Sequence, residues 1–447
     1  MGFMIIALCA VVFLLSLRIE KNLYNPITIF SFIWMFIFSL YQMRCFGIFE
    51  VSDQTYYLMM LGIVSFFGGA LAGYIPAPVK VKLSDEAVTD QIIHYRLIKA
   101  AGLIVLAFMA CEAIETYQLL RSGNSLFEIR TSLQGYAEYD FSSGLYALRK
   151  RIGPLYTWMI LPVYNSLLLI TCIDILLGKR DRQLIFISLL CMLLKSFKEG
   201  SRVAVFIFMI YLVFCFLICK ESNIRMRNLK RIKKKLVIGT AALTGILILL
   251  SVIRISQGQK TVFEEIYMYF TCCIPLFDYW SNAPGLSFRT GGAASLYGII
   301  QLPVTFLNVI TGSSQWYKSG QQAITDTELF VKIRSMGYSD SYNAYTTAFY
   351  YFLKDFGITG IVAGSAVFGG VCSLVYNRIK CNIRNLAFSK RLIFIYLLLI
   401  QAMILSFVRI YFSVASFSFT FIYAFIFIRD AKAVPVRSVK NGKAAYR

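Results

Sequence analysis

Residues 236–255 read LVIGTAALTGILILLSVIRI and follow a strongly basic stretch, KESNIRMRNLKRIKKK, at 220–235. Twenty mostly apolar residues at about 1.5 Å each make a helix about 30 Å long, which matches the hydrocarbon core of a bilayer. Lys and Arg residues that flank a membrane span tend to stay in the cytoplasm. The sequence therefore predicts a membrane-crossing helix that begins inside, and it places the segment that follows, to about residue 355, outside.

Composition extends this prediction to the whole chain. Hydrophobic residues fill 58% of the 447 positions and charged residues only 15%, whereas soluble domains average about 25% charged residues. We expect one all-α, polytopic transmembrane domain over 1–447, with its N-terminus outside and its C-terminus inside. The first apolar stretch lacks a basic leader, so it is predicted to be a span and not a signal peptide. Eleven spans are predicted, at about 2–17, 27–45, 56–74, 98–119, 153–177, 184–194, 203–219, 236–255, 356–376, 392–407 and 412–428.

The net charge of +22 fits this orientation better than it fits nucleic-acid binding. The predicted inner segments, including the basic loop 220–235 and the tail 429–447, carry 28 of the 45 Lys/Arg residues but 8 of the 23 Asp/Glu residues when Lys99 and Asp174, near the inner ends of their spans, are counted with them. No basic domain with interleaved aromatic residues lies outside the spans, so no nucleic-acid partner is expected. With a single histidine, His94, and no Cys/His ligand spacing, the sequence predicts neither a metal site nor a cofactor.

Two predicted outer segments, 120–152 and 256–355, are too long to be simple turns. Within the second, 262–280 and 293–310 are apolar and aromatic, but prolines and acidic residues interrupt them. We expect them to form helices that lie on or dip into the outer leaflet. Either could instead be a true span, which would reverse the orientation of everything on one side of it.

The sequence KSFKEGSR at 195–202 joins the sixth and seventh predicted spans on the outer side. The N-terminus of the seventh helix presents unpaired N–H groups and the positive end of the helix dipole there. Lys198 and Arg202 add two cations, which makes a site suited to a phosphate or a diphosphate. The alternative is an arginine that snorkels to the lipid headgroups.

Arg254, Arg289 and Arg409 are also predicted to lie on the outer side. Lys and Arg residues near membrane spans usually stay on the cytoplasmic side, so the outer position of these three needs a reason. A polyanionic lipid headgroup would supply one, and local ion pairing is the alternative. A base is needed where a sugar hydroxyl attacks an anomeric carbon. The sequence offers several outer carboxylates for that task, among them Glu199, Asp340 and Asp355.

The sequence YNAYTTAFYYFLKDFGITG at 342–360 leads into a span dotted with glycines. Sugars stack on aromatic rings and bond to amide and carboxylate groups, so a glycan-binding platform is one interpretation. An interfacial aromatic belt with a small-residue packing face is the other. The candidate glycan-binding residues are Tyr342, Asn343, Tyr345 and Tyr350.

These features together resemble the O-antigen polymerase (Wzy) family of bacterial repeat-unit polymerases. The resemblance rests on the multi-span plan with two enlarged outer loops and on Gly200-Ser201-Arg202 at the start of a span. It also rests on the run from Asn343 through Asp355-Phe356-Gly357 to Gly360, which is similar to the family's Asn-x-x-Thr…Asp-Phe-Gly-x-x-Gly pattern. Related ligases tend to use a periplasmic histidine, and none is predicted here, which favours a polymerase.

The resemblance implies a GT-C-like membrane glycosyltransferase in the bacterial inner membrane, acting at its periplasmic face. Its substrates would be oligosaccharide repeat units on undecaprenyl diphosphate, and a chain-length-regulating co-polymerase would be a partner, beside the membrane lipids. Arg202 and Lys198 would hold the diphosphate, with Arg254, Arg289 and Arg409 as further helpers. Arg202, Glu199, Asp340 and Asp355 are the catalytic candidates. A flippase or transporter of lipid-linked glycans and an O-antigen ligase remain the alternative functions.

Overall fold

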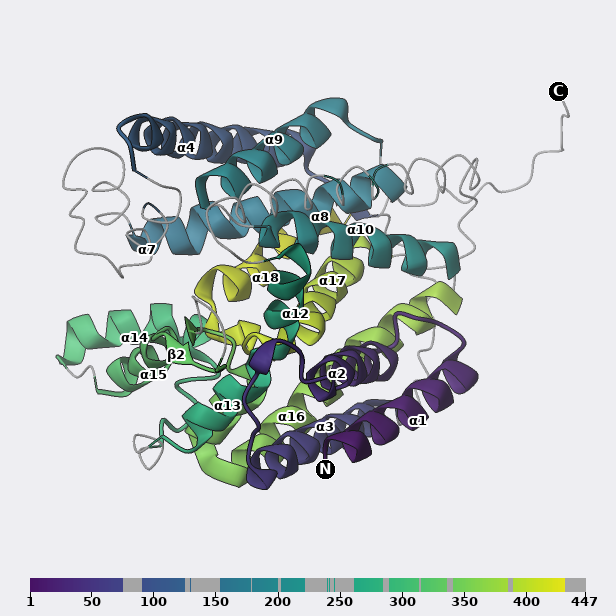
Figure 1. The fold of residues 1–447 in the computed structure, drawn as a ribbon. Helices are drawn as coiled ribbons and strands as arrows, with labels where there is room; N and C mark the ends of the chain where they lie inside the picture. The colour runs from purple at the N-terminus through teal and green to yellow at the C-terminus, as the bar shows by residue number, and fades with distance from the viewer. Residues whose placement is uncertain are drawn as a thin grey trace, which may run out of the picture.

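Helices make up nearly all of the described chain in a computed structural model (Figure 1). The predicted span at 236–255, the basic loop 220–235 and the outer segment 120–152 lie largely outside the described residues, as does the tail beyond 430. The structure describes residues 1–74, 91–124, 129, 153–177, 179–199, 202–221, 239, 241, 245, 261–283, 289–312, 315–335, 341–384 and 389–430.

Seven helical segments in these ranges are long and apolar enough to cross a membrane. The chain is therefore all-helical in a way consistent with a polytopic membrane protein. The segments are α1 (Gly2–Glu20), α3 (Asp53–Tyr74), α4 (Tyr95–Arg121), η2 with α8 (Tyr156–Ile160 and Leu161–Leu177), α10 (Val203–Glu221), α16 (Thr347–Arg384) and α17 with η4 (Lys390–Ile404 and Leu405–Phe407).

Three further helices match predicted spans: α2 (Pro26–Gln42), α9 (Arg182–Glu199) and α18 (Ala415–Phe427). Each of the ten predicted spans that fall within the described residues coincides with one of these helical segments. Local signals explain where some of them begin. The Asn25 side chain accepts a hydrogen bond from the N–H of Ile27 and Pro26 opens α2, while Ser389 caps α17 in the same way. Whether each helix crosses a membrane stays a prediction.

Glycines allow α3 and α16 to pack backbone against backbone. A Cβ atom at Gly69 would lie 1.9 Å from the carbonyl oxygen of Ala366, and one at Gly369 would lie 2.2 Å from that of Phe66. Such small-residue faces let helices approach closely where no hydrophobic effect drives them together. The small-residue packing face that the sequence predicts in the glycine-dotted span is therefore present.

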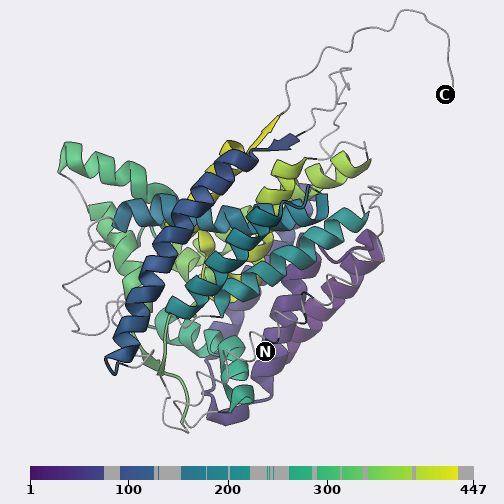
Figure 2. The same cartoon turned by 90° about the horizontal axis from the view of Figure 1, so that it is seen from above.

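Segments that the sequence places on the same side of the membrane meet at the same end of the bundle. At one end, β1 (Gln91–Ile93) pairs antiparallel with β4 (Ile428–Asp430), and Lys380 forms an ion pair with Glu20. At the other end lie α14 (Tyr297–Thr311), α15 (Gln315–Thr327) and the short pair β2 (Val331–Lys332) and β3 (Ser341–Tyr342). Figure 2 shows the paired strands β1 (blue) and β4 (yellow) side by side at one end of the blue α4. Below, the two ends are called the strand end and the α14 end.

We predict that the strand end faces the cytoplasm. A reporter fused after Lys235 should then report the cytoplasm, because eight Lys/Arg residues at 220–235 resist translocation. A reporter fused after Trp316, in α15, should report the periplasm. Reversal of both signals would overturn the orientation.

The apolar stretch 262–280 is helical, as predicted, and its place on the outer leaflet stays a prediction. It forms α12 (Val262–Thr271) and α13 (Cys273–Ser281), which pack against α2, α3 and α16 inside the bundle. Met268 and Leu276 are fully buried. The stretch 293–310 forms α14, which packs on α18 but leaves apolar side chains such as Phe306 and Ile310 exposed. Helix α12 also leaves apolar side chains exposed, among them Phe263 and Ile266, so both stretches keep apolar surface of the kind that a helix at a membrane surface needs.

Candidate functional site

Helix α12 brings together distant parts of the chain at the α14 end. Thr261 caps its first turn, where Glu264 and Glu265 follow. Glu264 binds Arg334 at 2.5 Å, and Glu265 binds Arg202 at 2.6 Å. Carboxylates in the first turn are favoured because the helix dipole is positive there. Each of them also fixes an arginine from another segment.

Arg202 lies where the sequence places it, immediately before α10. Its backbone carbonyl accepts the N–H of Phe206, and its side chain remains 17% exposed while it binds Glu265. The guanidinium is thus held at the surface of the α14 end by a carboxylate that leaves part of it accessible. Gly200 and Ser201, the other members of the motif, lie outside the described residues.

Phe407, two residues before Arg409, contacts the same helix one turn further along. Tyr269 of α12 packs on Tyr345 with ring centroids 5.1 Å apart, and both rings contact Phe407. Arg409 follows two residues later and lies 4.0 Å from Glu328. Glu265 and Tyr269 are four residues apart, so about 6 Å of helix separates the two contacts. Arg202 is therefore bound to α12 directly, whereas Arg409 follows a residue, Phe407, that packs on the next turn of this helix.

Lys198 is placed differently from the expectation that it binds a diphosphate. Its side chain is 0% exposed, and it forms an ion pair with Glu112 of α4 while its ammonium donates to the Tyr156 hydroxyl at 2.9 Å. A buried charge needs such partners because its desolvation costs several kcal/mol. These contacts favour a structural role for Lys198, as a link between α4, α9 and η2. Glu199, one residue on, is partly exposed and lies 3.9 Å from Lys195.

The Asp-Phe-Gly triplet breaks α16 into two parts. Phe356 (φ −137°) and Gly357 (φ 70°, ψ −148°) leave the helical conformation, so the carbonyl groups before them lose their usual partners four residues on. Arg289 donates to the carbonyl of Leu353 at 2.7 Å, and the N–H of Thr290 donates to that of Lys354 at 3.2 Å. Arg289 and Thr290, which precede α14, thus bind the backbone of α16 just before the break.

Asp355 adds further contacts between α16 and the residues that precede α14. It is 1% exposed, and its carboxylate accepts the Thr290 hydroxyl and, at 2.9 Å each, the N–H groups of Ala294 and Ser295. A carboxylate with three donors anchors a turn well. These contacts account for Asp355 structurally, and its catalytic assignment stays a prediction. Arg289 likewise binds the backbone of α16, and its role in binding the diphosphate stays a prediction.

Replacement of Gly357 by alanine should destabilise the protein by about 1–3 kcal/mol, because this backbone conformation is open essentially to glycine alone. The added Cβ would also lie 3.3 Å from the Arg289 guanidinium. The thermal midpoint of the detergent-purified protein measures the effect. Gly68→Ala in α3 is the matched control, since nothing lies within 4 Å of its added Cβ. Equal midpoints for the two variants would show that the break tolerates a side chain.

The glycan-binding candidates divide into two groups. Tyr342 and Asn343 are half-buried, and the Asn343 amide donates to the Glu328 carbonyl at 2.7 Å. Burial raises the pKa of the Tyr342 hydroxyl, so that group stays protonated. Tyr350 is 2% exposed and packs near Trp280, and Tyr345 packs among the rings beside α12. The aromatic run is thus largely internal packing. Two further site candidates, Arg254 and Asp340, lie outside the described residues.

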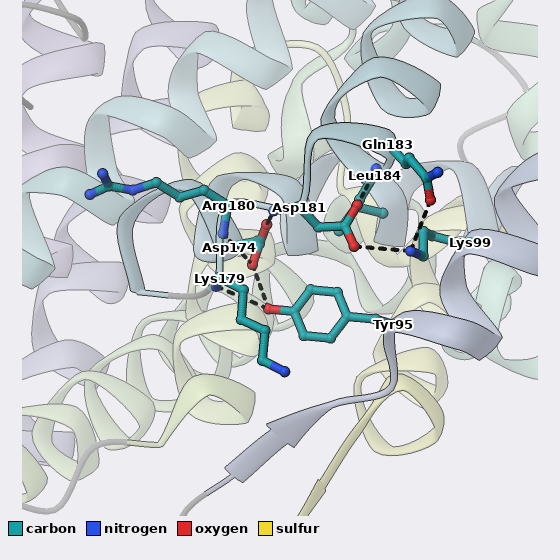
Figure 3. Close-up of polar contacts among 8 residues, drawn as sticks. All are labelled: Tyr95, Lys99, Asp174, Lys179, Arg180, Asp181, Gln183 and Leu184. Carbon is teal, nitrogen blue, oxygen red and sulfur yellow. Dashed lines mark hydrogen bonds and ion pairs between the residues drawn. The ribbon is translucent and has the colours of Figure 1, made fainter.

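A second polar cluster, at the strand end, accounts for Asp174 of α8 (Figure 3). This fully buried carboxylate accepts the Tyr95 hydroxyl at 2.5 Å and the N–H of Asp181 at 2.7 Å. Asp181 in turn binds Lys99 at 3.0 Å and caps α9 through the N–H of Leu184. Burial raises the pKa of Asp181, but these two partners outweigh it and hold the pKa below its ordinary value. The cluster fastens the α8–α9 turn to α4.

Sequence reasoning missed the partners that hold the arginines and the lysine. Glu265 is one of several outer carboxylates, but nothing in the spacing pairs it with Arg202, which is 63 residues away. Glu112, Tyr156 and Arg334 carry no sequence signal for their contacts. Among the residues that the structure describes, no group of His, Cys, Asp and Glu side chains is arranged to hold a metal ion.

No family model, curated protein or solved structure matches this chain.

Proposed function

We propose that this protein joins undecaprenyl-diphosphate-linked oligosaccharide repeat units into longer chains at the periplasmic face of the bacterial inner membrane. The observation that carries the proposal is that Arg202 binds Glu265 of α12 at the α14 end, while Phe407, two residues before Arg409, packs on Tyr269 one turn further along the same helix. Arginine suits a diphosphate because its fork of donors matches phosphate oxygens. A diphosphate attached to a membrane lipid would reach the protein at a surface of this kind.

The reaction exchanges one bond at the donor's anomeric carbon for another. The acceptor sugar's hydroxyl oxygen attacks that carbon, the bond from the carbon to the diphosphate oxygen breaks, and undecaprenyl diphosphate leaves with the electron pair. The acceptor's proton passes to a carboxylate, for which Glu199, partly exposed beside Lys195, and Asp340 are the candidates. Arg202 and Arg409 would stabilise the charge that develops on the leaving diphosphate.

The resemblance supports a polymerase over a ligase. Related ligases tend to use a periplasmic histidine, whereas His94, the single histidine of the sequence, directly follows β1 at the strand end. A flippase of lipid-linked glycans would also need outward cations, and it is the second candidate. The tight packing of α12 and α13 inside the bundle favours a fixed site over a transport path.

Purified full-length protein incubated with its lipid-linked repeat unit tests the proposal. We expect oligomers on the carrier lipid without any nucleotide sugar. In cells, loss of a polymerase leaves surface lipid that carries one repeat unit, whereas loss of a flippase leaves none, so a gel of extracted lipopolysaccharide separates the two functions. Failure of the purified protein to lengthen its carrier-bound glycan would overturn the assignment.

A further inference from the structure

Four buried hydroxyl groups lie where the start of α16 meets residues 405–409. They are 0% exposed, and none has a hydrogen-bond partner among the residues that the structure describes. A buried hydroxyl without a partner costs about 1–3 kcal/mol, so four in one region need an explanation. We call this set the hydroxyl cluster; its members are Thr346, Thr347, Tyr351 and Ser406.

Contacts between the two segments bring the members of the hydroxyl cluster together. The N–H of Thr346 donates to the carbonyl of Val408 at 3.1 Å, and Ser406 precedes Val408 by two residues within η4, which contacts α16. Thr347 and Tyr351 are four residues apart in α16 and therefore share one face of the helix. The cluster thus sits at a single contact between two segments that are about sixty residues apart in the sequence.

The backbone at the cluster is strained. Thr347 has φ 67°, and Ala344, three residues earlier, has φ 64°. The left-handed region is unfavourable for a β-branched residue, and strain of this kind concentrates at ligand sites and switch regions. Strain and unpaired hydroxyls together indicate that this contact is not optimised for stability alone.

A charged group stands beside the hydroxyl cluster. Burial lowers the pKa of Arg409, but the neighbouring Tyr351 and Glu328 outweigh it and leave the pKa above its ordinary value. The guanidinium is therefore charged, and Tyr351 of the cluster lies within its electrostatic range. A ligand that presents hydroxyl groups next to an anionic group would match both features.

We propose that the hydroxyl cluster is the closed form of a binding site for the sugar next to the diphosphate of a lipid-linked repeat unit. A hydroxyl can donate and accept, so a sugar offers partners to all four members at once and recovers the free energy that burial without partners costs. Because the four residues are fully buried, residues 405–409 must move away from α16 to admit the sugar. This inference rests on the proposed function and adds the residues that recognise its substrate.

Tyr351→Phe tests the proposal, because it removes one hydroxyl and keeps the ring. If the hydroxyl has no ligand, its removal should leave activity unchanged and raise or preserve stability. If it binds the sugar, we expect kcat/KM for lengthening of the lipid-linked repeat unit to fall about tenfold or more, with a thermal midpoint no lower than wild type. The matched control is Tyr164→Phe in α8, whose hydroxyl is also buried and without a partner among the described residues; its kcat/KM should not change.

Ser406→Ala provides a second test of the sugar site if the Tyr351→Phe variant fails to accumulate. Its control is Ser373→Ala, which removes another fully buried hydroxyl of the same kind further along α16. Wild-type kcat/KM in the cluster variants, or an equal fall in the controls, would overturn the sugar site while the polymerase assignment stands. If the wild-type protein itself does not lengthen the glycan, both proposals fall together.

Discussion

Arg202→Ala is expected to lower the rate of repeat-unit joining by about 10²–10³-fold, by analogy with the loss of one oxyanion-hole donor. The long-chain ladder of extracted lipopolysaccharide should disappear while the protein still inserts and accumulates. The physical reason is that the guanidinium is partly exposed at the α14 end and stabilises charge that develops only as the diphosphate leaves. A gel of the polysaccharide and an immunoblot of the membrane fraction measure the two quantities.

Glu265→Gln separates substrate binding from ion pairing. Arg202 binds Glu265 at 2.6 Å, so a purely structural pair would suffer from the loss of either partner. If Arg202 instead binds the diphosphate, the glutamine variant should keep activity within a few-fold of wild type, because the arginine and a hydrogen-bonding side chain both remain. A wild-type ladder in Arg202→Ala, or an equal loss in Glu265→Gln, would contradict the diphosphate assignment.

Lys198→Ala should cause the largest loss of stability, about 3–5 kcal/mol, because it leaves Glu112 buried without its counter-charge. Both side chains are at most 1% exposed, so water cannot take the place of the lysine. We expect little folded protein after detergent extraction, which the area of the monodisperse peak in size-exclusion chromatography measures.

The double variant Lys198→Met with Glu112→Met identifies the role of the lysine. Replacing a buried ion pair by apolar side chains is often neutral or stabilising, so the double variant should accumulate like wild type. We expect it to polymerise as well, because the contacts of Lys198 are structural. If it accumulates but makes no long chains, Lys198 binds substrate as its place in the 195–202 motif predicts.

The helical plan could be predicted because its signals are local. Apolar stretches of membrane length, with caps such as Asn25 and Ser389, coincide with helices throughout the described chain. The place of 262–280 on the outer leaflet stays a prediction, because periodicity alone does not distinguish a helix beside lipid from one inside a bundle. The tertiary structure adds the contacts of α12 with α2, and of α13 with α3 and α16, which periodicity could not predict.

The site was only partly predictable for a related reason. The helix start marks Arg202, and outward charge marks Arg409, as unusual; the structure binds Arg202 to α12 and places Arg409 near Glu328. The sequence also assigned Lys198 to the diphosphate, from its place in the 195–202 motif, and Asp355 to catalysis, as an outer carboxylate. The structure adds contacts that spacing did not predict, because Lys198 is buried against Glu112 and Asp355 anchors the turn before α14. Sequence spacing carries no information on which distant carboxylate or N–H group will meet a given side chain.

The sequence by itself determined that this chain is a bundle of apolar helices, because burial of apolar residues and satisfaction of backbone hydrogen bonds act within each segment. Only the tertiary structure decided which charges are paired, which hydroxyls are left without partners and where α16 breaks against residues 289–295. Those outcomes depend on contacts between segments far apart in the chain. The role of a charged group or a hydroxyl is therefore set by the residues that it contacts in the folded protein.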